Sequence, residues 1–180
     1  MPDYNTYLFS LINSISGQSD FLDTIIVFFA HYLAYVLIFT FIILIFFSSA
    51  LYKSKIHLFL SALIGFAFGR GVVVELFRFL YHHPRPSIIL SNVHPLLVET
   101  SYSFPSGHTT AFFTLSFVMW NYNKSLGIVF FIFSTIMGIA RIAAGIHYPL
   151  DIMAGAIIGL LIGFATTRIV NVFMNKYTKI

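Results

Sequence analysis

The sequence predicts an all-α integral membrane protein, with about five transmembrane helices and a short N-terminal interfacial helix. Its residues are 58% hydrophobic and only 9% charged, whereas soluble domains carry about a quarter charged residues. Long apolar stretches also recur along the whole chain, and a helix needs about 20 apolar residues to cross a bilayer. We expect all 180 residues to form a single membrane-embedded domain.

The first segment, residues 2–20, is mixed in polarity and has the periodicity of an amphipathic helix. Its apolar positions recur at intervals of three or four residues: Tyr4, Tyr7, Leu8, Leu11 and Ile12. Asn13 and Ser14 lie on the opposite side of such a helix. This pattern predicts a short helix at the membrane surface and not a transmembrane segment.

Five apolar segments follow, and we expect each to be a transmembrane helix. They cover residues 22–47, 56–81, 106–122, 125–143 and 150–174. The third segment is short for a helix that crosses a bilayer. The one long connection, about residues 82–105, joins the second and third segments and is rich in Pro, Ser and His.

The charges outside these segments predict the orientation in the membrane. With five transmembrane helices, one side carries Lys53, Lys55, Lys124, Lys176 and Lys179, and the other carries Asp3, Asp20, Asp23 and Glu99. The positive-inside rule makes the lysine side cytoplasmic. We therefore expect a multi-pass protein of the cell membrane (inner or plasma membrane), with the long connection on the extracytoplasmic side.

Ionisable residues in the second half of the chain fall into three fragments. They are Arg78 with Arg85-Pro86, then Pro105-Ser106-Gly107-His108, and finally Arg141 with His147 and Asp151. Charge inside a membrane protein is costly and usually marks a functional site. Guanidinium groups match phosphate oxygens, and imidazoles transfer protons near neutral pH. The combination therefore suits chemistry on a phosphate ester.

Each fragment taken alone also has a structural interpretation. Arg78 could reach the interface or pair with Glu75 one turn earlier, and Ser106 could begin an ordinary capped helix. His147 and Asp151 could be an interfacial histidine and a helix-capping carboxylate. However, all three fragments map to one layer of the membrane, and this coincidence favours a shared site.

The functional interpretation assigns chemistry to the same residues. The start of a helix at Ser106 offers free N–H groups to an anion, and Gly107 allows that anion to approach the backbone. Asp151 could accept the N–H of His147 and leave the other ring nitrogen free to attack.

These fragments resemble the motifs of the type-2 phosphatidic acid phosphatase superfamily, which shares its core with vanadium-dependent haloperoxidases. The family pattern is Lys-x6-Arg-Pro, then Pro-Ser-Gly-His, then Ser-Arg-x5-His-x3-Asp. The sequence here has Arg78-x6-Arg85-Pro86, then Pro105-Ser106-Gly107-His108, then Ala140-Arg141-x5-His147-x3-Asp151. Arg78 replaces the usual lysine and Ala140 the usual serine.

The resemblance implies that His147 is a nucleophile that forms a phosphohistidine and is oriented by Asp151. It implies that His108 protonates the leaving oxygen and then activates water. It also implies a set of groups that hold the phosphoryl oxygens: Arg78, Arg85, Arg141, Ser106 and Gly107. The reaction would then need no metal ion and no other cofactor.

The short chain and its opening, which leads into Leu22-Asp23, resemble bacterial undecaprenyl diphosphatases of the bacitracin-resistance type. The resemblance implies a lipid diphosphate or monophosphate substrate in the bilayer, most specifically undecaprenyl diphosphate, whose product supports cell-wall synthesis. Alternatives on the same scaffold are phosphatases of phosphatidylglycerophosphate, phosphatidic acid or lipid A. A small transporter with a polar path and a relative without turnover are the non-enzymatic alternatives. Scattered basic residues argue against a nucleic-acid partner, and the oligomeric state stays open.

Arg70, Glu75 and His83 lie near these fragments but outside the family motifs. Arg70 and Glu75 could form a structural pair, although a spacing of five is unfavourable on one helix face. Glu75 could instead serve the substrate site or handle protons, and His83 could contact a second phosphate or have no role. Several glycines are expected to allow close helix contacts: Gly69, Gly71, Gly138, Gly145, Gly155 and Gly163.

Overall fold

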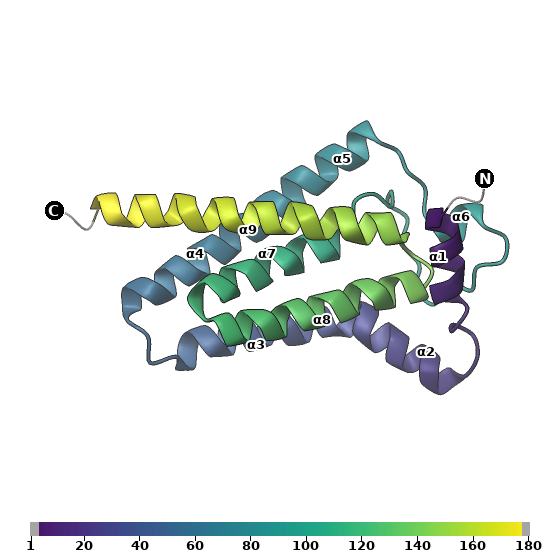
Figure 1. Cartoon of the computed structure of the whole chain (residues 1–180), viewed down its shortest axis with the longest axis horizontal. Helices are drawn as coiled ribbons and strands as arrows, with labels where there is room; N and C mark the ends of the chain where they lie inside the picture. Colours follow the sequence, from purple (N-terminus) through teal and green to yellow (C-terminus); the bar gives the residue numbers. More distant parts are fainter. Residues whose placement is uncertain (1–3, 178–180) are drawn as a thin grey trace.

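The computed structural model describes residues 4–177, which form an elongated bundle of helices with no strand in that range (Figure 1). Asp3 and Lys179, which entered the orientation argument, lie outside the described residues. In chain order the elements are α1 (Tyr4–Asn13), α2 (Asp20–Val27), η1 (Phe28–Tyr32), α3 (Leu33–Phe47), α4 (Tyr52–Phe68), η2 (Gly69–Val73), α5 (Val74–Leu80), α6 (Pro86–Ile89), α7 (Gly107–Tyr122), α8 (Lys124–Ala143) and α9 (Pro149–Tyr177). The predicted all-α fold is confirmed.

Within residues 4–177, four continuous helical stretches are long and apolar enough to cross a membrane: Asp20–Phe47, Tyr52–Leu80, Lys124–Ala143 and Pro149–Lys176. They correspond to the first, second, fourth and fifth predicted segments. The third segment is α7, which has 16 residues and lies at the centre of the bundle against α4, α8 and α9. Its short length suits this position, since most of its residues are buried.

The helix α1 lies across one end of the bundle, as Figure 1 shows. Its last residue, Asn13, is buried and donates from Nδ2 to the Ala143 carbonyl at the end of α8, at 2.7 Å. Outward-facing aromatic and aliphatic residues such as Tyr4 and Leu11 stay exposed. This arrangement matches the predicted interfacial helix.

Two transmembrane stretches contain a π-helical turn, η1 and η2, and this feature was not predicted. Hydrogen bonds in a π-helix join residues five apart, and such turns are frequent at functional sites. Arg70 lies in η2, and its Nη1 pairs with Oε1 of Glu75. The structural pair suggested by the sequence is therefore present, and the π-helical turn accommodates its unfavourable spacing of five.

Glycines on α9 bring its backbone directly against α7. A Cβ atom at Gly155 would lie 2.8 Å from the Ser106 carbonyl oxygen, and one at Gly159 would lie 2.5 Å from the Thr110 carbonyl oxygen. This confirms the predicted role of Gly155 and adds Gly159. Gly71 is different, because nothing lies within 4 Å of its added Cβ. The prediction for Gly71 is wrong, since it faces away from the other helices.

The close packing fixes the starts of α7 and α9 beside each other. The Ser106 N–H donates to the Asp151 carbonyl oxygen at 3.1 Å. The connections before both helices therefore meet at the same end of the bundle. Lys53, Lys124 and Lys176 occupy the opposite end, where α4 and α8 begin and α9 finishes (Figure 1).

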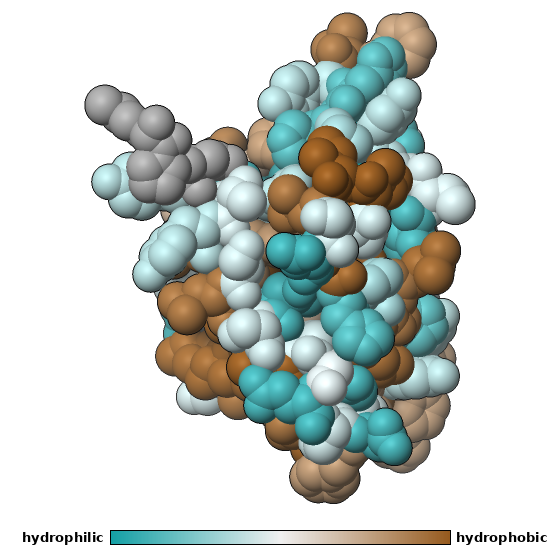
Figure 2. All heavy atoms as spheres, turned by 90° about the vertical axis from the view of Figure 1, so that its right-hand side faces the viewer, coloured by the Kyte–Doolittle hydropathy of each residue, from teal (hydrophilic) through white to brown (hydrophobic). Residues whose placement is uncertain are grey.

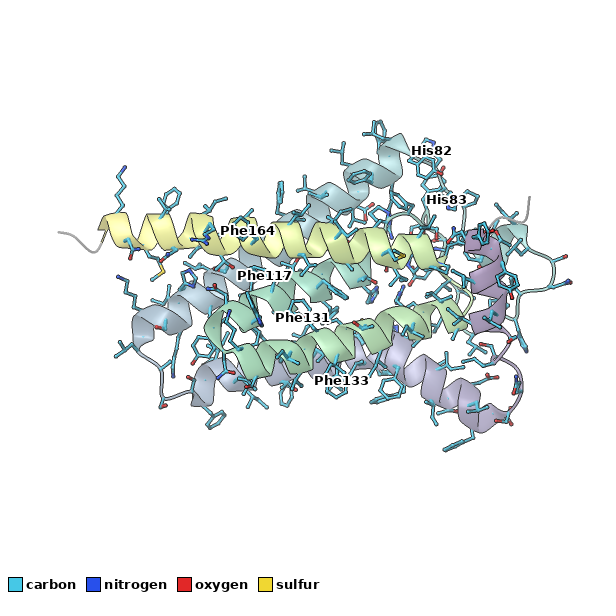
Figure 3. All side chains as sticks on the ribbon, in the orientation of Figure 1. His82, His83, Phe117, Phe131, Phe133 and Phe164 are labelled. Carbon is cyan, nitrogen blue, oxygen red and sulfur yellow. The ribbon has the colours of Figure 1, made fainter. Side chains whose placement is uncertain are left out.

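Figure 2 looks onto the end of the bundle where these connections meet. Hydrophilic and intermediate residues cover much of the middle of this face, and hydrophobic residues lie at several points around its edge. Along the bundle, aromatic side chains fill the space between helices, as for Phe117 and Phe164, whose ring centroids are 6.2 Å apart (Figure 3). The polar end and apolar length are those expected of a multi-pass membrane protein.

Candidate active site

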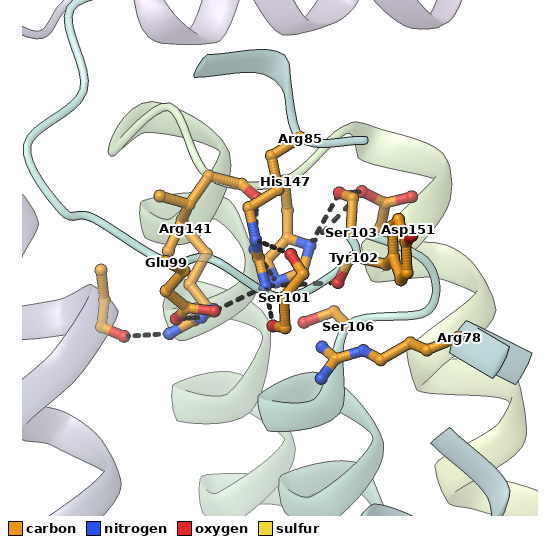
Figure 4. Close-up of polar contacts among 12 residues, drawn as sticks. Arg78, Arg85, Glu99, Ser101, Tyr102, Ser103, Ser106, Arg141, His147 and Asp151 are labelled. Carbon is orange, nitrogen blue, oxygen red and sulfur yellow. Dashed lines mark hydrogen bonds and ion pairs between the residues drawn. The ribbon is translucent and has the colours of Figure 1, made fainter. Parts of the chain in front are cut away.

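The first and third sequence fragments meet at Arg85 and His147. Nη1 of Arg85 lies 3.2 Å from Nε2 of His147 (Figure 4). Arg85 follows α5 and begins α6, and His147 lies in the connection between α8 and α9. Both side chains are completely buried, with no exposed surface.

Loop carbonyls hold the Arg85 guanidinium in one position. Nε donates to the Ser101 carbonyl at 2.8 Å, and Nη1 donates to the Ile146 carbonyl at 2.6 Å. Nη2 also donates to Oγ of Ser101 at 3.0 Å. Burial lowers the pKa of Arg85 to about 10, an effect that Glu99 opposes. Arg85 therefore remains a cation at neutral pH.

Asp151 and Ser103 orient the His147 ring. Oδ2 of Asp151 and Oγ of Ser103 each lie 3.3 Å from Nδ1 of His147. The Ser103 hydroxyl donates to Asp151, which also accepts the Tyr148 N–H at 2.8 Å. The Ser103 hydroxyl uses its proton in the hydrogen bond to Asp151, so Oγ of Ser103 and Oδ2 of Asp151 can both act only as acceptors toward Nδ1. The proton of the neutral ring therefore lies on Nδ1. The lone pair of Nε2 then faces Arg85.

The ring of His147 is neutral in this environment. Burial lowers the pKa of His147 to about 4, although the hydrogen bond with Asp151 favours the protonated form. Arg141 and Arg85 act in the same direction as burial, because their charges repel an imidazolium. A neutral Nε2 keeps the lone pair that attack on an electrophilic phosphorus atom requires.

Glu99 joins two of the three predicted arginines, and the sequence analysis missed it. Its Oε2 lies 2.6 Å from Nη2 of Arg85, and its Oε1 pairs with Nη2 of Arg141. Burial disfavours its charged form, but Arg141 and Arg85 outweigh that effect and lower the pKa of Glu99 to about 2. The Glu99 carboxylate therefore lies between the guanidinium groups of Arg85 and Arg141.

Arg141 is buried, with 1% of its side chain exposed, and a backbone carbonyl holds its guanidinium in addition to Glu99. Its Nη1 donates to the Ala30 carbonyl of η1 at 3.0 Å. Its Nε has no hydrogen-bond partner among the described residues. A phosphate oxygen that replaced Glu99 would offer acceptors to this group.

Arg78 is the third predicted arginine and lies beside Ser106 in Figure 4. Its Nη1 is 3.1 Å from Oε1 of Glu75, so the structural pairing considered from the sequence exists. Its side chain is nevertheless buried, and its Nε has no hydrogen-bond partner in the described part of the chain. Glu75 therefore positions Arg78 and leaves one donor for a ligand.

The Pro-Ser-Gly-His fragment begins α7 as predicted. Ser106 is the N-cap, and its Oγ accepts from Oγ1 of Thr109 at 3.0 Å. Gly107 has no room for a side chain, because an added Cβ would lie 2.5 Å from Nε of Arg70. Arg70 thus lies against the backbone of this helix start, a fourth guanidinium at the site.

His108 lies in the first turn of α7, beside a small cavity. It lines a cavity of about 150 Å³ together with Arg70, Gly107 and the apolar Tyr35 and Phe66. The charges of Arg141 and Glu99 and the ring of His147 are within electrostatic reach of His108. The two imidazoles therefore belong to one site.

His83 lies next to this site without a direct contact to Arg85 or His147 among the interactions described. Its ring stacks on Tyr81 and meets the Tyr148 ring edge-on at a centroid distance of 5.3 Å. Its Nδ1 is buried without a hydrogen-bond partner in the described range. His82 packs on Tyr102 instead, and their ring centroids are 4.6 Å apart (His82 and His83 are labelled in Figure 3).

A charge argument could have found Glu99 from the sequence. Three arginines buried in one layer need a carboxylate partner, and Glu99 is the one acidic residue in the connection of residues 82–105. Ser103 gives no comparable signal, because that connection contains several serines and nothing local distinguishes it.

Comparison with known proteins extends these observations. Residues 58–175 match the family model described as the PAP2 superfamily. The sequence is 32% identical to undecaprenyl-diphosphatase BcrC of Bacillus subtilis, covering 97% of this chain and 96% of that protein. Its structure is similar to that of Aquifex aeolicus LpxE, with a TM-score of 0.74 and 32% identity over 92% of this chain and 95% of that one.

A second solved structure shows the same fold at lower identity. It is a transmembrane PAP2-type phosphatidylglycerolphosphate phosphatase from Bacillus subtilis, with a TM-score of 0.67 and 20% identity. The similarity covers 97% of this chain and 88% of that chain.

Proposed function

Because the chain belongs to the PAP2 superfamily and is a membrane lipid-phosphate hydrolase, we propose that it converts undecaprenyl diphosphate to undecaprenyl phosphate. The observation that carries the proposal is the pairing of Arg85 with Nε2 of His147, whose Nδ1 is held by Asp151. The similarity to undecaprenyl-diphosphatase BcrC over nearly the full length of both chains supports the choice of substrate.

In the proposed first step, Nε2 of His147 attacks the terminal phosphorus of the diphosphate. A P–N bond forms as the bond from that phosphorus to the bridging oxygen breaks, and the lipid monophosphate leaves. His108 donates a proton to the departing oxygen. The Nδ1 proton stays with His147, where Asp151 stabilises the positive charge that develops on the ring.

In the second step, water replaces the histidine on phosphorus. His108, now neutral, removes a proton from the attacking water, the P–N bond breaks, and inorganic phosphate forms. Catalysis of phosphoryl transfer depends mostly on position and on neutralising the equatorial oxygens. Arg78, Arg85 and Arg141 would supply that charge, together with the Ser106 side chain and the N–H group of Gly107 at the start of α7.

The proposal includes the location of the site at the extracytoplasmic face of the cell membrane. The catalytic end of the bundle carries Asp20 and Asp23 at the start of α2, while Lys53, Lys124 and Lys176 lie at the other end. This charge asymmetry supports a cytoplasmic lysine end under the positive-inside rule.

Release of inorganic phosphate from a panel of lipids tests the substrate. The purified protein receives undecaprenyl diphosphate, phosphatidylglycerophosphate, phosphatidic acid or lipid A, each with and without a chelator. We expect the highest kcat/KM with undecaprenyl diphosphate and no loss with the chelator, because arginines balance the phosphate charge. Preference for a glycerophospholipid or for lipid A would overturn the proposed substrate.

A His147→Ala variant tests the proposed nucleophile on the same panel. We expect phosphate release to fall by more than about 1,000-fold, because water would have to attack without a covalent step. His83→Ala is the matched control, since it removes a nearby imidazole that does not contact the Arg85–His147 pair. Turnover near the normal rate in His147→Ala would rule out the phosphohistidine mechanism.

A further inference from the structure

A second polar cavity lies between α4, α7 and α9, at the end of the bundle opposite the active site. Its volume is about 520 Å³. It is formed by the first turns of α4, the last turn of α7 and the C-terminal part of α9, with the lining residues Lys53, Ser54, His57, Val118, Asn121, Tyr122, Thr167, Arg168, Asn171 and Met174. The proposed reaction uses none of these residues.

The lining combines positive charge with neutral hydrogen-bonding groups. Lys53 and Arg168 are its two permanent cations, and Asn121 and Asn171 contribute amides to the same lining. No acidic residue follows Asp151 in the sequence, and none occurs in residues 24–74 or 100–150. The positive charge of the cavity is therefore not neutralised by a carboxylate side chain of α4, α7 or the C-terminal part of α9.

The walls of the cavity are held in place by specific contacts. His57 on α4 donates from Nε2 to the buried Thr167 carbonyl on α9 at 3.2 Å, which joins two walls. The Arg168 guanidinium lies 5.3 Å from the centre of the Phe164 ring, one turn earlier on α9 (Phe164 is labelled in Figure 3). The first helical turn of α4 has no side-chain cap, so its free N–H groups add partial positive charge.

Helix length places this cavity at the second membrane surface. Asp151 and Arg168 are both on α9, and 17 residues of α-helix rise about 26 Å, close to the roughly 30 Å thickness of the hydrocarbon core. Cationic pockets between transmembrane helices at a membrane surface suit anionic head groups.

We propose that this cavity is a binding site for a phosphate group, carried by an anionic lipid head group or free in solution, at the membrane surface opposite the active site. Lys53 and Arg168 bind the phosphate oxygens, and Asn121 and Asn171 donate to the remaining oxygens or to the head-group hydroxyls. Val118, which is buried, and Met174 form the apolar part of the lining.

Binding by the purified full-length protein in neutral detergent tests this site. The probes are a short-chain phosphatidylglycerol, a short-chain phosphatidylcholine and inorganic phosphate, each titrated while the unfolding temperature is measured. The test variant is Lys53→Gln/Arg168→Gln. The matched control is Lys124→Gln/Lys176→Gln, which removes two charges from the same end of the bundle outside the cavity.

We expect phosphatidylglycerol to stabilise the wild type and the control variant and to bind at least about tenfold more weakly to the test variant. The same pattern with inorganic phosphate would identify free phosphate as a sufficient ligand, and its absence would assign the site to the lipid. Equal weakening in both double variants, or equal binding of phosphatidylcholine, would overturn the proposal.

Two further measurements keep the result interpretable. If the double variant does not fold, the single variants Lys53→Gln and Arg168→Gln replace it. Each should bind phosphatidylglycerol more weakly than the wild type does. Hydrolysis of the lipid diphosphate should persist in all these variants, because the active site lies at the other end. Loss of head-group binding with retained turnover therefore separates this site from the proposed function.

Discussion

At the scale of single residues, the site is a balance between buried cations and two carboxylates. Glu99 neutralises Arg85 and Arg141, while Asp151 accepts from Ser103 and orients His147. A buried arginine without a partner would be costly, so the resting protein needs Glu99 where the substrate phosphate would bind. Substrate binding then exchanges one anion for another.

Replacing Glu99 by Gln tests this exchange. Without the competing carboxylate, we expect inorganic phosphate to inhibit with an inhibition constant about tenfold lower, equivalent to about 1.4 kcal/mol. The same variant should unfold at a lower temperature, because two buried arginines lose their partner, and added phosphate should restore part of that loss. Inhibition and thermal unfolding are measured on one preparation.

Asp20→Asn is the control for this prediction, since Asp20 is an exposed carboxylate at the same end of the bundle and does not lie between Arg85 and Arg141. An unchanged inhibition constant in Glu99→Gln would show that the carboxylate does not compete with phosphate.

The low pKa of His147, about 4, predicts the acid limit of activity. The ring stays neutral as pH falls through the ordinary histidine value of about 6.5, so kcat/KM should not decline there. It should decline only as pH approaches about 4, where Nε2 takes up a proton. The pH profile of kcat/KM in the free enzyme measures this pKa.

The same pKa also affects stability. Between about 6.5 and about 4 the unfolded chain binds a proton at His147 that the folded protein does not. The free energy of unfolding therefore decreases as pH falls through that interval. Unfolding temperatures at each pH separate loss of folded protein from titration of the proposed nucleophile, and a kinetic midpoint near 6.5 would contradict a buried neutral ring.

At the scale of helices, the α7–α9 contact and the π-helical turns place the side chains of the site. The glycines of α9 let Ser106 bond to the Asp151 backbone. The turn η2 lets Arg70 and Glu75 pair at a spacing of five, and η1 offers the Ala30 carbonyl to Arg141. Regular α-helices would rotate these groups away from one another.

Gly159→Leu should separate α7 from α9. A Cβ at this position would lie 2.5 Å from the Thr110 carbonyl oxygen, and overpacking of this kind costs about 1–3 kcal/mol. We expect a lower unfolding temperature and reduced turnover, because the starts of both helices would shift. Gly71→Ala is the control, since nothing lies within 4 Å of its added Cβ; equal effects of both substitutions would contradict the packing argument.

Sequence reasoning located the long elements well and the irregular ones poorly. Apolar length and lysine positions predict the transmembrane stretches to within a few residues, because both follow from the bilayer itself. The turns η1 and η2 and the short α6 depend on tertiary contacts and have no periodic signal. In the same way, the sequence motifs predict His108, His147 and Asp151 as site residues. They do not predict which loop residues contact Arg85, because those contacts depend on the three-dimensional path of residues 90–106.

At the scale of the whole molecule, the bundle has two chemically different ends separated by apolar helices. One end holds the active site and the other holds the lysines and the second cavity. The chain contains no cysteine, so its orientation can be measured with single introduced thiols on an otherwise unreactive protein.

Ser91→Cys and Ser125→Cys are a matched pair for this measurement, since both serines are exposed and lie at opposite ends. In intact cells, a membrane-impermeant thiol reagent should label Ser91→Cys, and it should label Ser125→Cys only after the membrane is opened. Phosphate release by each variant confirms that it is folded. The reverse labelling pattern would place the active site in the cytoplasm.

The position of Glu99 between Arg85 and Arg141 has a consequence for the protein in its natural surroundings. Sulfate, chloride and free phosphate in solution meet a carboxylate already in contact with the guanidinium groups. A soluble anion must displace it from dilute solution, whereas a lipid phosphate anchored in the bilayer is confined beside it at a high local concentration. The enzyme is thereby shielded from ambient salts while staying open to its own lipid.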